Sequence, residues 1–308
     1  VSHLAKAPVM VVFTREDDMT AGTYRPASKY RIKAALKDGK ITGYHLKEAS
    51  INGNMYGLIP NFFPGGSIDN YQVDVANYQS NITTGAWRAP YTNFLASAEQ
   101  SFFDEIAETL NVDRAQLHLE LLEKAKANKD ERMEYSPERM EAVVKKTIEV
   151  SNWGKAPKNV DQGISIYYCH NTHVAEVVDL ELENGFPSIK KITCVVDCGI
   201  VVNPTGAKNQ VVGGILDGIG HMMYGELKFI DGVPQSNNFN NYQLIRINQV
   251  PPEIDVHFIE SNEAPTGLGE PTLPPIGGAI ANAIYKATGQ RLYKQPYMQS
   301  FNPVEATT

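Results

Sequence analysis

The chain has few cysteines, no long apolar run and no excess of basic residues. Its 308 residues include only three cysteines, an odd number without the dense spacing of a disulfide scaffold. No run of about 18 apolar residues occurs, so no transmembrane segment is expected. The net charge of -7 argues against nucleic acid as a partner. What is left is an ordinary globular composition, long enough for about two domains.

Apolar and alternating runs, with turn signals between them, predict strands. Asp38-Gly39 and Asn184-Gly185 are typical hairpin turns. Val9–Thr14 is expected to be a buried strand, and the polar segment after it a loop. A further strand pair is expected between 224–230 and 254–260. The expected strands are 9–14, 30–36, 41–49, 174–182, 189–196, 224–230 and 254–260.

Apolar residues at helical spacing predict several helices. The clearest stripe consists of Phe94, Ala98, Phe102, Ile106 and Leu110. Other helices are expected after the caps Asp113 and Ser136, after Pro204 and before Gly289. Hairpins and helices are segregated along the chain, which favours an α+β fold of mixed sheets with hairpins and packed helices. The expected division is into domains 1–155 and 156–308.

The segment from Thr266 to Gly278 places one carboxylate, Glu270, among glycines, prolines and apolar residues. Such a loop is expected to solvate the carboxylate poorly, which suits a general base. Its glycines, Gly267 and Gly269, allow the backbone to approach a bulky cofactor closely. Composition alone, however, favours a solvated surface glutamate.

Two further segments carry groups suited to a cofactor. Thr83–Phe94 places Arg88 before a long helix, where an arginine and exposed amides suit an anionic group. A helix-end or salt-bridge role is the more common one for such an arginine. Gln210 follows a turn near a helix start, where it can bind a polar cofactor edge, cap the helix or lie on the surface.

The cysteines and histidines predict no metal ligands. Cys194 and Cys198 lack a second Cys/His pair at zinc spacing and are expected in the core. His170 and His173 are three positions apart, which on a strand places them on opposite faces. Both are expected to be ordinary strand or loop histidines.

Taken in order, these segments resemble the molybdopterin-binding large subunit of the xanthine dehydrogenase and aldehyde oxidase family. The most similar subgroup is that of isoquinoline 1-oxidoreductase and nicotinate dehydrogenase. The matching segments are PVMVVFTREDDM with TYRPAS, TGAWRAP with EQSFFDEIA, VAEV, VVDCGIVVNP with NQVVGGILDGIG, NFNNY, and GLGEP with AIANAIYKATGQR. They span nearly the whole chain, so this part of the large subunit is the expected identity.

The resemblance implies a role for particular residues. Glu270 matches the base that removes a proton from the water-derived oxygen attacking an electron-poor carbon. Ala86, Trp87 and Arg88 match a turn close to the metal's oxo ligands, and Gln210 matches a glutamine near the pterin. Gly267 and Gly269 flank the cofactor side of the GLGEP loop. The implied cofactor is molybdenum with molybdopterin cytosine dinucleotide, and the implied substrate is an N-heteroaromatic compound or an aldehyde.

The sequence also departs from the family pattern. Pro90 stands where xanthine oxidases carry an aromatic residue, which argues against a purine substrate. The glycine-rich segments that line the cofactor are absent, as are cysteines for iron–sulfur clusters and a flavin segment. The expected partners are therefore the rest of the large subunit or a complementary chain, and a small subunit with 2Fe-2S clusters. The isolated chain is expected to bind no molybdenum.

Two other functions and two locations stay open. A non-catalytic homologue or assembly fragment without cofactor is the main alternative. A metal-independent hydrolase lacks a GxSxG elbow and ranks last. The location is the cytoplasm or the periplasm.

Overall fold

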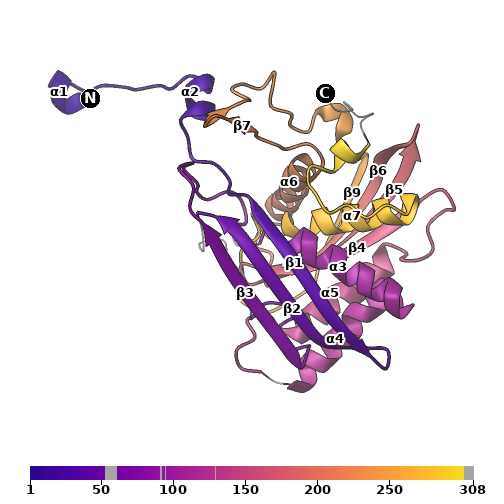
Figure 1. Cartoon of the computed structure of the whole chain (residues 1–308). Helices are drawn as coiled ribbons and strands as arrows, with labels where there is room; N and C mark the ends of the chain where they lie inside the picture. Colours follow the sequence, from indigo (N-terminus) through magenta and orange to yellow (C-terminus); the bar gives the residue numbers. More distant parts are fainter. Residues whose placement is uncertain (53–60, 91, 94, 129, 302–308) are drawn as a thin grey trace.

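The structure is a computed structural model that describes residues 1–52, 61–90, 92–93, 95–128 and 130–301. Figure 1 shows two main sheets, with helices packed between and beside them, and an N-terminal arm that projects away from the body. The helices are α1 (Ser2–Ala5), α2 (Arg15–Thr20), α3 (Leu95–Leu110), α4 (Arg114–Asn128), α5 (Pro137–Val150), α6 (Pro204–Met223) and α7 (Pro274–Thr288), with 3₁₀ turns η1 (Ile247–Gln249) and η2 (Tyr297–Ser300).

The first sheet has three strands in the order β1-β2-β3. β1 (Ser28–Lys37) and β2 (Lys40–Ile51) form the antiparallel hairpin predicted from Asp38-Gly39, whose φ values are 51° and 73°. β3 (Asn70–Tyr78) pairs in parallel with β2 and is a strand that the sequence pattern did not predict.

The second sheet has four strands in the order β4-β5-β6-β9. β5 (Thr172–Glu183) and β6 (Phe186–Asp197) form the predicted hairpin across Asn184-Gly185. β4 (Asp161–Cys169), which was not predicted, pairs antiparallel with β5, while β9 (Glu253–Phe258) pairs in parallel with β6.

Both faces of the second sheet are buried, which explains the nearly continuous apolar sequence of its strands. Because successive side chains alternate, one set packs toward α3, α4 and α5 and the other toward α6 and α7. The first set includes Ile164, Ile166, Ala175, Val177 and Val195. The second includes Val174, Val178, Ile192, Cys194 and Val196.

The predicted helices are confirmed, and their caps explain where they begin and end. Asp113 accepts the N–H of Gln116 at 3.0 Å before α4, and Ser136 accepts the N–H of Arg139 before α5. Gly289 ends α7 with φ 72°. Phe94, the first residue of the stripe predicted for α3, lies outside the described residues.

Helices on one side of the expected boundary near residue 155 pack on strands from the other side. α3 contacts α7, and α5 contacts β5 and β6. One apolar cluster joins residues such as Leu122 and Val143 with Ile166 and Val195. The division into domains 1–155 and 156–308 stays a prediction.

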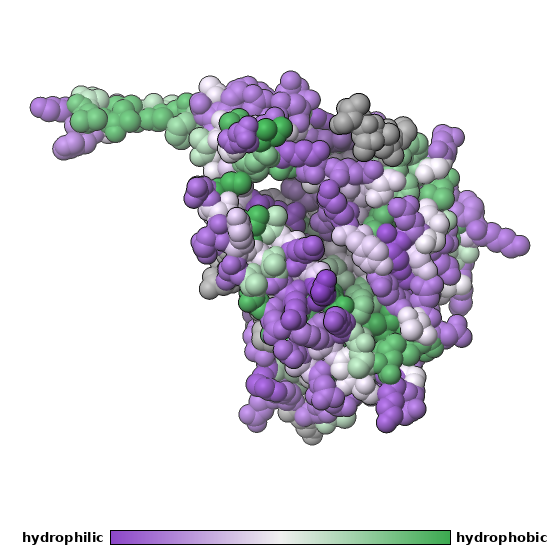
Figure 2. Space-filling model, viewed as in Figure 1, coloured by the Kyte–Doolittle hydropathy of each residue, from purple (hydrophilic) through white to green (hydrophobic). Residues whose placement is uncertain are grey.

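Two expectations for the N-terminal segment are wrong. Residues 9–14 form no strand, and their apolar side chains are exposed, with Met10 at 88% and Phe13 at 68%. Figure 2 shows this apolar arm extending into solvent. Residues 15–20 of the polar segment that follows form α2 and not a loop, because Thr14 and Asp17 make a capping box at its start; the rest of the segment, before β1, is a loop as predicted.

The strand pair expected between 224–230 and 254–260 is also wrong. β9 lies against β6. Residues 229–230 instead form β7, which pairs with β8 at residues 233–234. Parallel pairing joins segments far apart in sequence, so no local turn signal reports it.

Candidate functional site

The turn that carries Arg88 is held from both sides. Its start is tied to the N-terminal region, because the Gly85 N–H donates to the Tyr24 carbonyl at 3.0 Å. Its end is held by the buried Asn93 side chain, which donates to the carbonyls of Arg88 and Ala89 at 2.8 Å each. Ala89 is buried and has φ 57°, a left-handed conformation that this bonding maintains.

The loop that carries Glu270 is anchored at the end of the second sheet. The Thr266 N–H donates to the Cys198 carbonyl at 2.9 Å, and the Gly267 N–H donates to the His170 carbonyl at 3.1 Å. A Cβ at Gly267 would lie 2.8 Å from the His170 Cβ, so this close approach requires glycine. The loop is therefore seated on the β4–β5 turn.

The structure brings these two loops together. The Arg88 Nε donates to the Gly269 carbonyl at 2.7 Å, and Nη2 donates to the same oxygen. The Ala89 N–H donates to Glu270 Oε1 at 3.0 Å. Residues 181 positions apart in the sequence thus meet at one carboxylate.

Arg88 also forms an ion pair. Its Nη1 lies 3.4 Å from Asp217 Oδ2 on α6. Burial acts to raise the pKa of Asp217, but the hydrogen bond from His221 and the charges of His221 and Arg88 outweigh it, so this pKa is lowered. The salt-bridge role left open for Arg88 is therefore present, alongside its contact with the Glu270 loop.

The carboxylate of Glu270 is partly solvated, which is closer to the surface glutamate that composition favours than to a poorly solvated base. Its side chain is 35% exposed. Glycines and prolines nearby in sequence do not enclose it, because exposure depends on what packs over the loop. Glu270 is an accessible carboxylate whose two oxygens both have partners within the chain.

His170 is the second partner of Glu270, and the sequence reasoning missed it. Its Nε2 lies 2.7 Å from Glu270 Oε2. His170 and Asn171 form the two-residue turn between β4 and β5, with φ 52° and 60°. That turn is a local signal, but nothing in the sequence relates it to a loop about a hundred residues later.

His173 lies apart from this contact. It is buried in β5, and its Nε2 accepts the N–H of Ser136 at 3.0 Å. Burial lowers the pKa of His173 to about 3. Within the described ranges, no group of three or more His, Cys, Asp or Glu side chains is placed to hold a metal ion.

The other candidate cofactor residues lie around the two loops. Trp87 packs edge-on against His221 with ring centroids 3.9 Å apart, and the Arg25 guanidinium lies 4.7 Å from its ring. Gln210 is exposed on α6, and its Oε1 lies 3.3 Å from the position of a Cβ on Gly269. Asn203 caps α6 by accepting the Gly206 N–H at 2.9 Å, so capping is not the role of Gln210.

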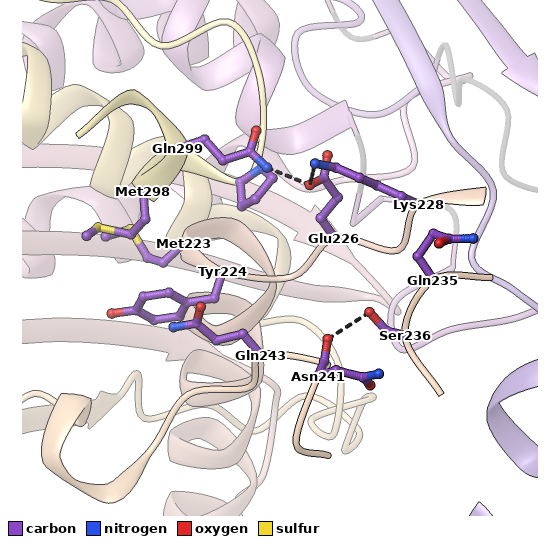
Figure 3. A pocket seen from close by; sticks show the side chains of 11 residues that line it. Met223, Tyr224, Glu226, Lys228, Gln235, Ser236, Asn241, Gln243, Met298 and Gln299 are labelled. Carbon is purple, nitrogen blue, oxygen red and sulfur yellow. Dashed lines mark hydrogen bonds and ion pairs between the residues drawn. The ribbon is translucent and has the colours of Figure 1, made fainter. Parts of the chain in front are cut away.

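A pocket of about 310 Å³ lies elsewhere, between the end of α6, the segment after it and η2. Figure 3 shows Lys228 and Gln299 both directed at the Glu226 carboxylate, at distances of 3.3 and 2.6 Å. None of the candidate site residues lines this pocket. Glu226 thus already has two partners among the polar side chains that line the pocket.

Two family models of the molybdopterin cofactor-binding domain match the chain, over residues 1–120 and 84–251. The second alone spans more than half of the 308 residues. The chain belongs to the molybdopterin cofactor-binding domain family. The family and the molybdopterin cofactor expected from the sequence segments are thereby confirmed.

Two relatives align with nearly the whole chain. The chain is 30% identical to the membrane-bound aldehyde dehydrogenase (pyrroloquinoline-quinone) of Gluconacetobacter polyoxogenes, over 95% of the chain and 42% of that protein. It is 29% identical to isoquinoline 1-oxidoreductase subunit beta of Brevundimonas diminuta, over 96% of the chain and 39% of that protein. The chain thus spans about two fifths of the length of these relatives.

Solved structures confirm the α+β fold of this molybdopterin-binding domain. Quinoline 2-oxidoreductase from Pseudomonas putida 86 superposes with a TM-score of 0.79 at 11% identity, over 96% of the chain and 64% of that chain. Aldehyde oxidoreductase from Desulfovibrio desulfuricans gives 0.74 at 12% identity, over 92% of the chain and 49% of that chain. In the described part of the chain, no helix is long and apolar enough to cross a membrane.

Proposed function

We propose that this chain is the part of a molybdenum hydroxylase large subunit that carries the general base, Glu270. The intact enzyme oxidises an aldehyde or hydroxylates an N-heteroaromatic compound with water-derived oxygen, the substrate classes that the names of its relatives indicate. One observation carries the proposal. The Arg88 turn and the Glu270 loop, far apart in sequence, are bonded to each other around an accessible carboxylate.

The residues present fit a pterin cofactor beside this carboxylate. Ala86, Gln210 and Gly267 are exposed, so a bound group can contact these residues. Gly267 and Gly269 present backbone without side chains. We assign cofactor contact to Ala86, Trp87, Arg88, Gln210, Gly267 and Gly269, with molybdopterin cytosine dinucleotide as the cofactor.

The cofactor and the Glu270 carboxylate have different chemical roles. When bound, the molybdenum cofactor supplies the two-electron redox chemistry. Glu270 accepts a proton from the attacking oxygen, which requires an ionised carboxylate held in place. The Ala89 N–H donates to Oε1 at 3.0 Å and so helps to hold the carboxylate in place.

The exposed apolar arm supports a partner for this chain. Residues 9–13 are all apolar, and each has at least 41% of its surface exposed. A contiguous apolar stretch in solvent is typical of a protein interaction site. We propose that the remaining part of the large subunit covers it, and that a small 2Fe-2S subunit carries electrons away. The same arm also suits the alternative of a non-catalytic assembly fragment.

Substitution of Glu270 in the intact complex separates these two functions. Glu270→Gln keeps the size of the side chain and removes its basicity, so turnover is expected to fall at least about a hundredfold with molybdenum and pterin still bound. Glu263→Gln, in the same exposed segment, is the matched control and should keep full turnover. Full turnover in Glu270→Gln refutes the base, and a complex without molybdenum favours the assembly fragment.

Elemental analysis of the isolated chain tests the partner. The chain alone is expected to contain no molybdenum, because the remaining part of the large subunit that we propose to cover the exposed arm is absent. Stoichiometric molybdenum in the isolated chain contradicts this expectation.

A further inference from the structure

The carboxylate of Glu270 is bonded at both oxygens by different segments. The Ala89 N–H donates to Oε1 at 3.0 Å, and His170 Nε2 lies 2.7 Å from Oε2. The torsion that turns a glutamate carboxylate is soft, with no sharply preferred angle. One hydrogen bond therefore leaves the carboxylate plane free to turn, whereas two partners on two oxygens fix it.

The other ring nitrogen of His170 indicates which way the bond runs. Nδ1 is buried and has no hydrogen-bond partner among the described residues. A proton on Nδ1 would thus be a buried donor without an acceptor, which is unfavourable. The ionised carboxylate only accepts hydrogen bonds, so the tautomer that fits carries its proton on Nε2 and donates it to Oε2.

The backbone holds His170 against the same loop. Its carbonyl accepts the Gly267 N–H at 3.1 Å, and a Cβ at Gly267 would lie 2.8 Å from the His170 Cβ. His170 has φ 52°, in the turn that joins β4 to β5. The imidazole is thus mounted on the end of the second sheet and not on the loop that it holds.

We propose that His170 is a positioning residue for Glu270: it donates from Nε2 to Oε2 and sets the plane in which the carboxylate accepts a proton. This inference rests on the proposed function of Glu270 as the base. His170 takes no proton from substrate. It acts through the carboxylate, so its loss affects the catalytic step more than substrate binding.

Two amide substitutions that differ only in reach test the proposal in the intact complex. His170→Asn tolerates the left-handed backbone but is too short to reach Oε2, whereas His170→Gln places an amide nitrogen near the position of Nε2. His170→Asn is expected to lower kcat about tenfold to a hundredfold with little change in KM. His170→Gln should recover most of that loss.

A histidine elsewhere provides the matched control. His45 Nε2 lies 2.8 Å from Asp74 Oδ2 on the first sheet, with similar exposure. His45→Asn removes the same kind of contact away from the site and should leave kcat unchanged. A fall in kcat equal to that of His170→Asn overturns the proposal.

A second readout needs no turnover. Nitrogen-15 NMR of the full chain, with His170 assigned from the signals missing in His170→Asn, is expected to show the Nε2-protonated tautomer. Glu270→Ala should shift that signal by removing the acceptor. An Nδ1-protonated ring, or a signal indifferent to Glu270→Ala, overturns the proposal.

The outcomes separate the two hypotheses. Full turnover in Glu270→Gln removes the proposed base whatever His170 does. Inactive Glu270→Gln together with full kcat in His170→Asn leaves the base intact and refutes positioning by His170. A change confined to KM, or an equal loss in His170→Asn and His170→Gln, also refutes it.

Discussion

Two carboxyl groups in this chain differ in what surrounds them. Glu176 is fully buried in β5, facing the side covered by α7, and accepts only the Cys194 thiol at 3.5 Å among its described contacts. Its Oε2 has no hydrogen-bond partner in the described part of the chain. Glu270 is 35% exposed, and both of its oxygens have partners from other segments.

The difference shows that the most deeply buried carboxyl groups of this chain are not the ones proposed to be functional. Burial raises the pKa of Glu176 well above its usual range, and it raises the pKa of Glu99 to about 8. Strongly perturbed carboxyl groups often mark active sites, but in this chain they lie in packed layers that a substrate cannot reach. The convergence of two distant loops on an accessible carboxylate is the better indicator.

The same substitution at both positions tests whether turnover needs the accessible carboxylate and not the buried one. Glu270→Gln should lower turnover of the intact complex at least about a hundredfold, because it removes the base. Glu176→Gln should leave turnover unchanged, because Glu176 is fully buried and a substrate cannot reach it. Steady-state kinetics on both variants check this, and comparable losses would show that Glu176 also contributes to turnover.

The buried carboxyl group of Glu99 makes the stability of the chain depend on pH. Burial raises its pKa in the folded chain from 4.5 to about 8, although the Tyr44 hydroxyl donates to it at 3.0 Å. The unfolded chain binds fewer protons between these values, so the free energy of unfolding falls as pH rises from 4.5 to about 8. The loss is up to about 4 kcal/mol.

Urea unfolding at pH 5 and pH 8 measures this effect, with Glu99→Gln as the comparison. The glutamine variant does not titrate, so its stability should fall less between the two pH values. An identical fall in both proteins assigns the pH dependence to other groups.

Close packing against α7 predicts the next effect. A Cβ at Gly163 would lie 2.1 Å from the Ala279 carbonyl oxygen and 2.3 Å from the Ala283 nitrogen, so Gly163→Ala forces the helix away from β4. We expect a destabilisation of about 3 kcal/mol. Gly185→Ala meets nothing within 4 Å and bears only the strain of φ 84°, about 1 kcal/mol. Thermal unfolding of both variants checks the order.

The smallest effect concerns the bond between the two loops. Arg88→Met removes two hydrogen bonds to the Gly269 carbonyl and should destabilise the chain by about 1–2 kcal/mol. Arg132→Met, which removes a pair with Asp130 from an 81% exposed arginine, should leave the melting temperature unchanged. Equal melting temperatures for the two variants would show that the loops stay together without Arg88.

Local signals predicted the elements that depend only on neighbouring residues. The turns at Asp38-Gly39 and Asn184-Gly185 have the positive φ values that such pairs favour. The stripe from Ala98 to Leu110 lies in α3. Arg88, from one segment, and Gly269 and Glu270, from another, lie together, although their roles as site residues stay predictions.

Long-range partners explain the failures. Residues 9–13 have a strand-like composition, but apolar side chains are buried only where another segment covers them, and here none does. β9 has the sequence of a strand, yet its partner β6 lies more than fifty residues away. The exposure of Glu270 likewise depends on what packs over its loop, which its sequence neighbours do not determine.

Periodicity, turn chemistry and ordered segments along the chain were enough to predict the two main hairpins, helices α3 to α7, the family and the candidate base. The contact of His170 with Glu270, and the hydrogen bonds from Arg88 to the loop that carries Glu270, are seen only in the tertiary structure. The tertiary structure also leaves Glu270 accessible and buries Glu99 and Glu176. Contacts across a hundred residues or more arise from how sheets and helices pack, and no local pattern encodes them.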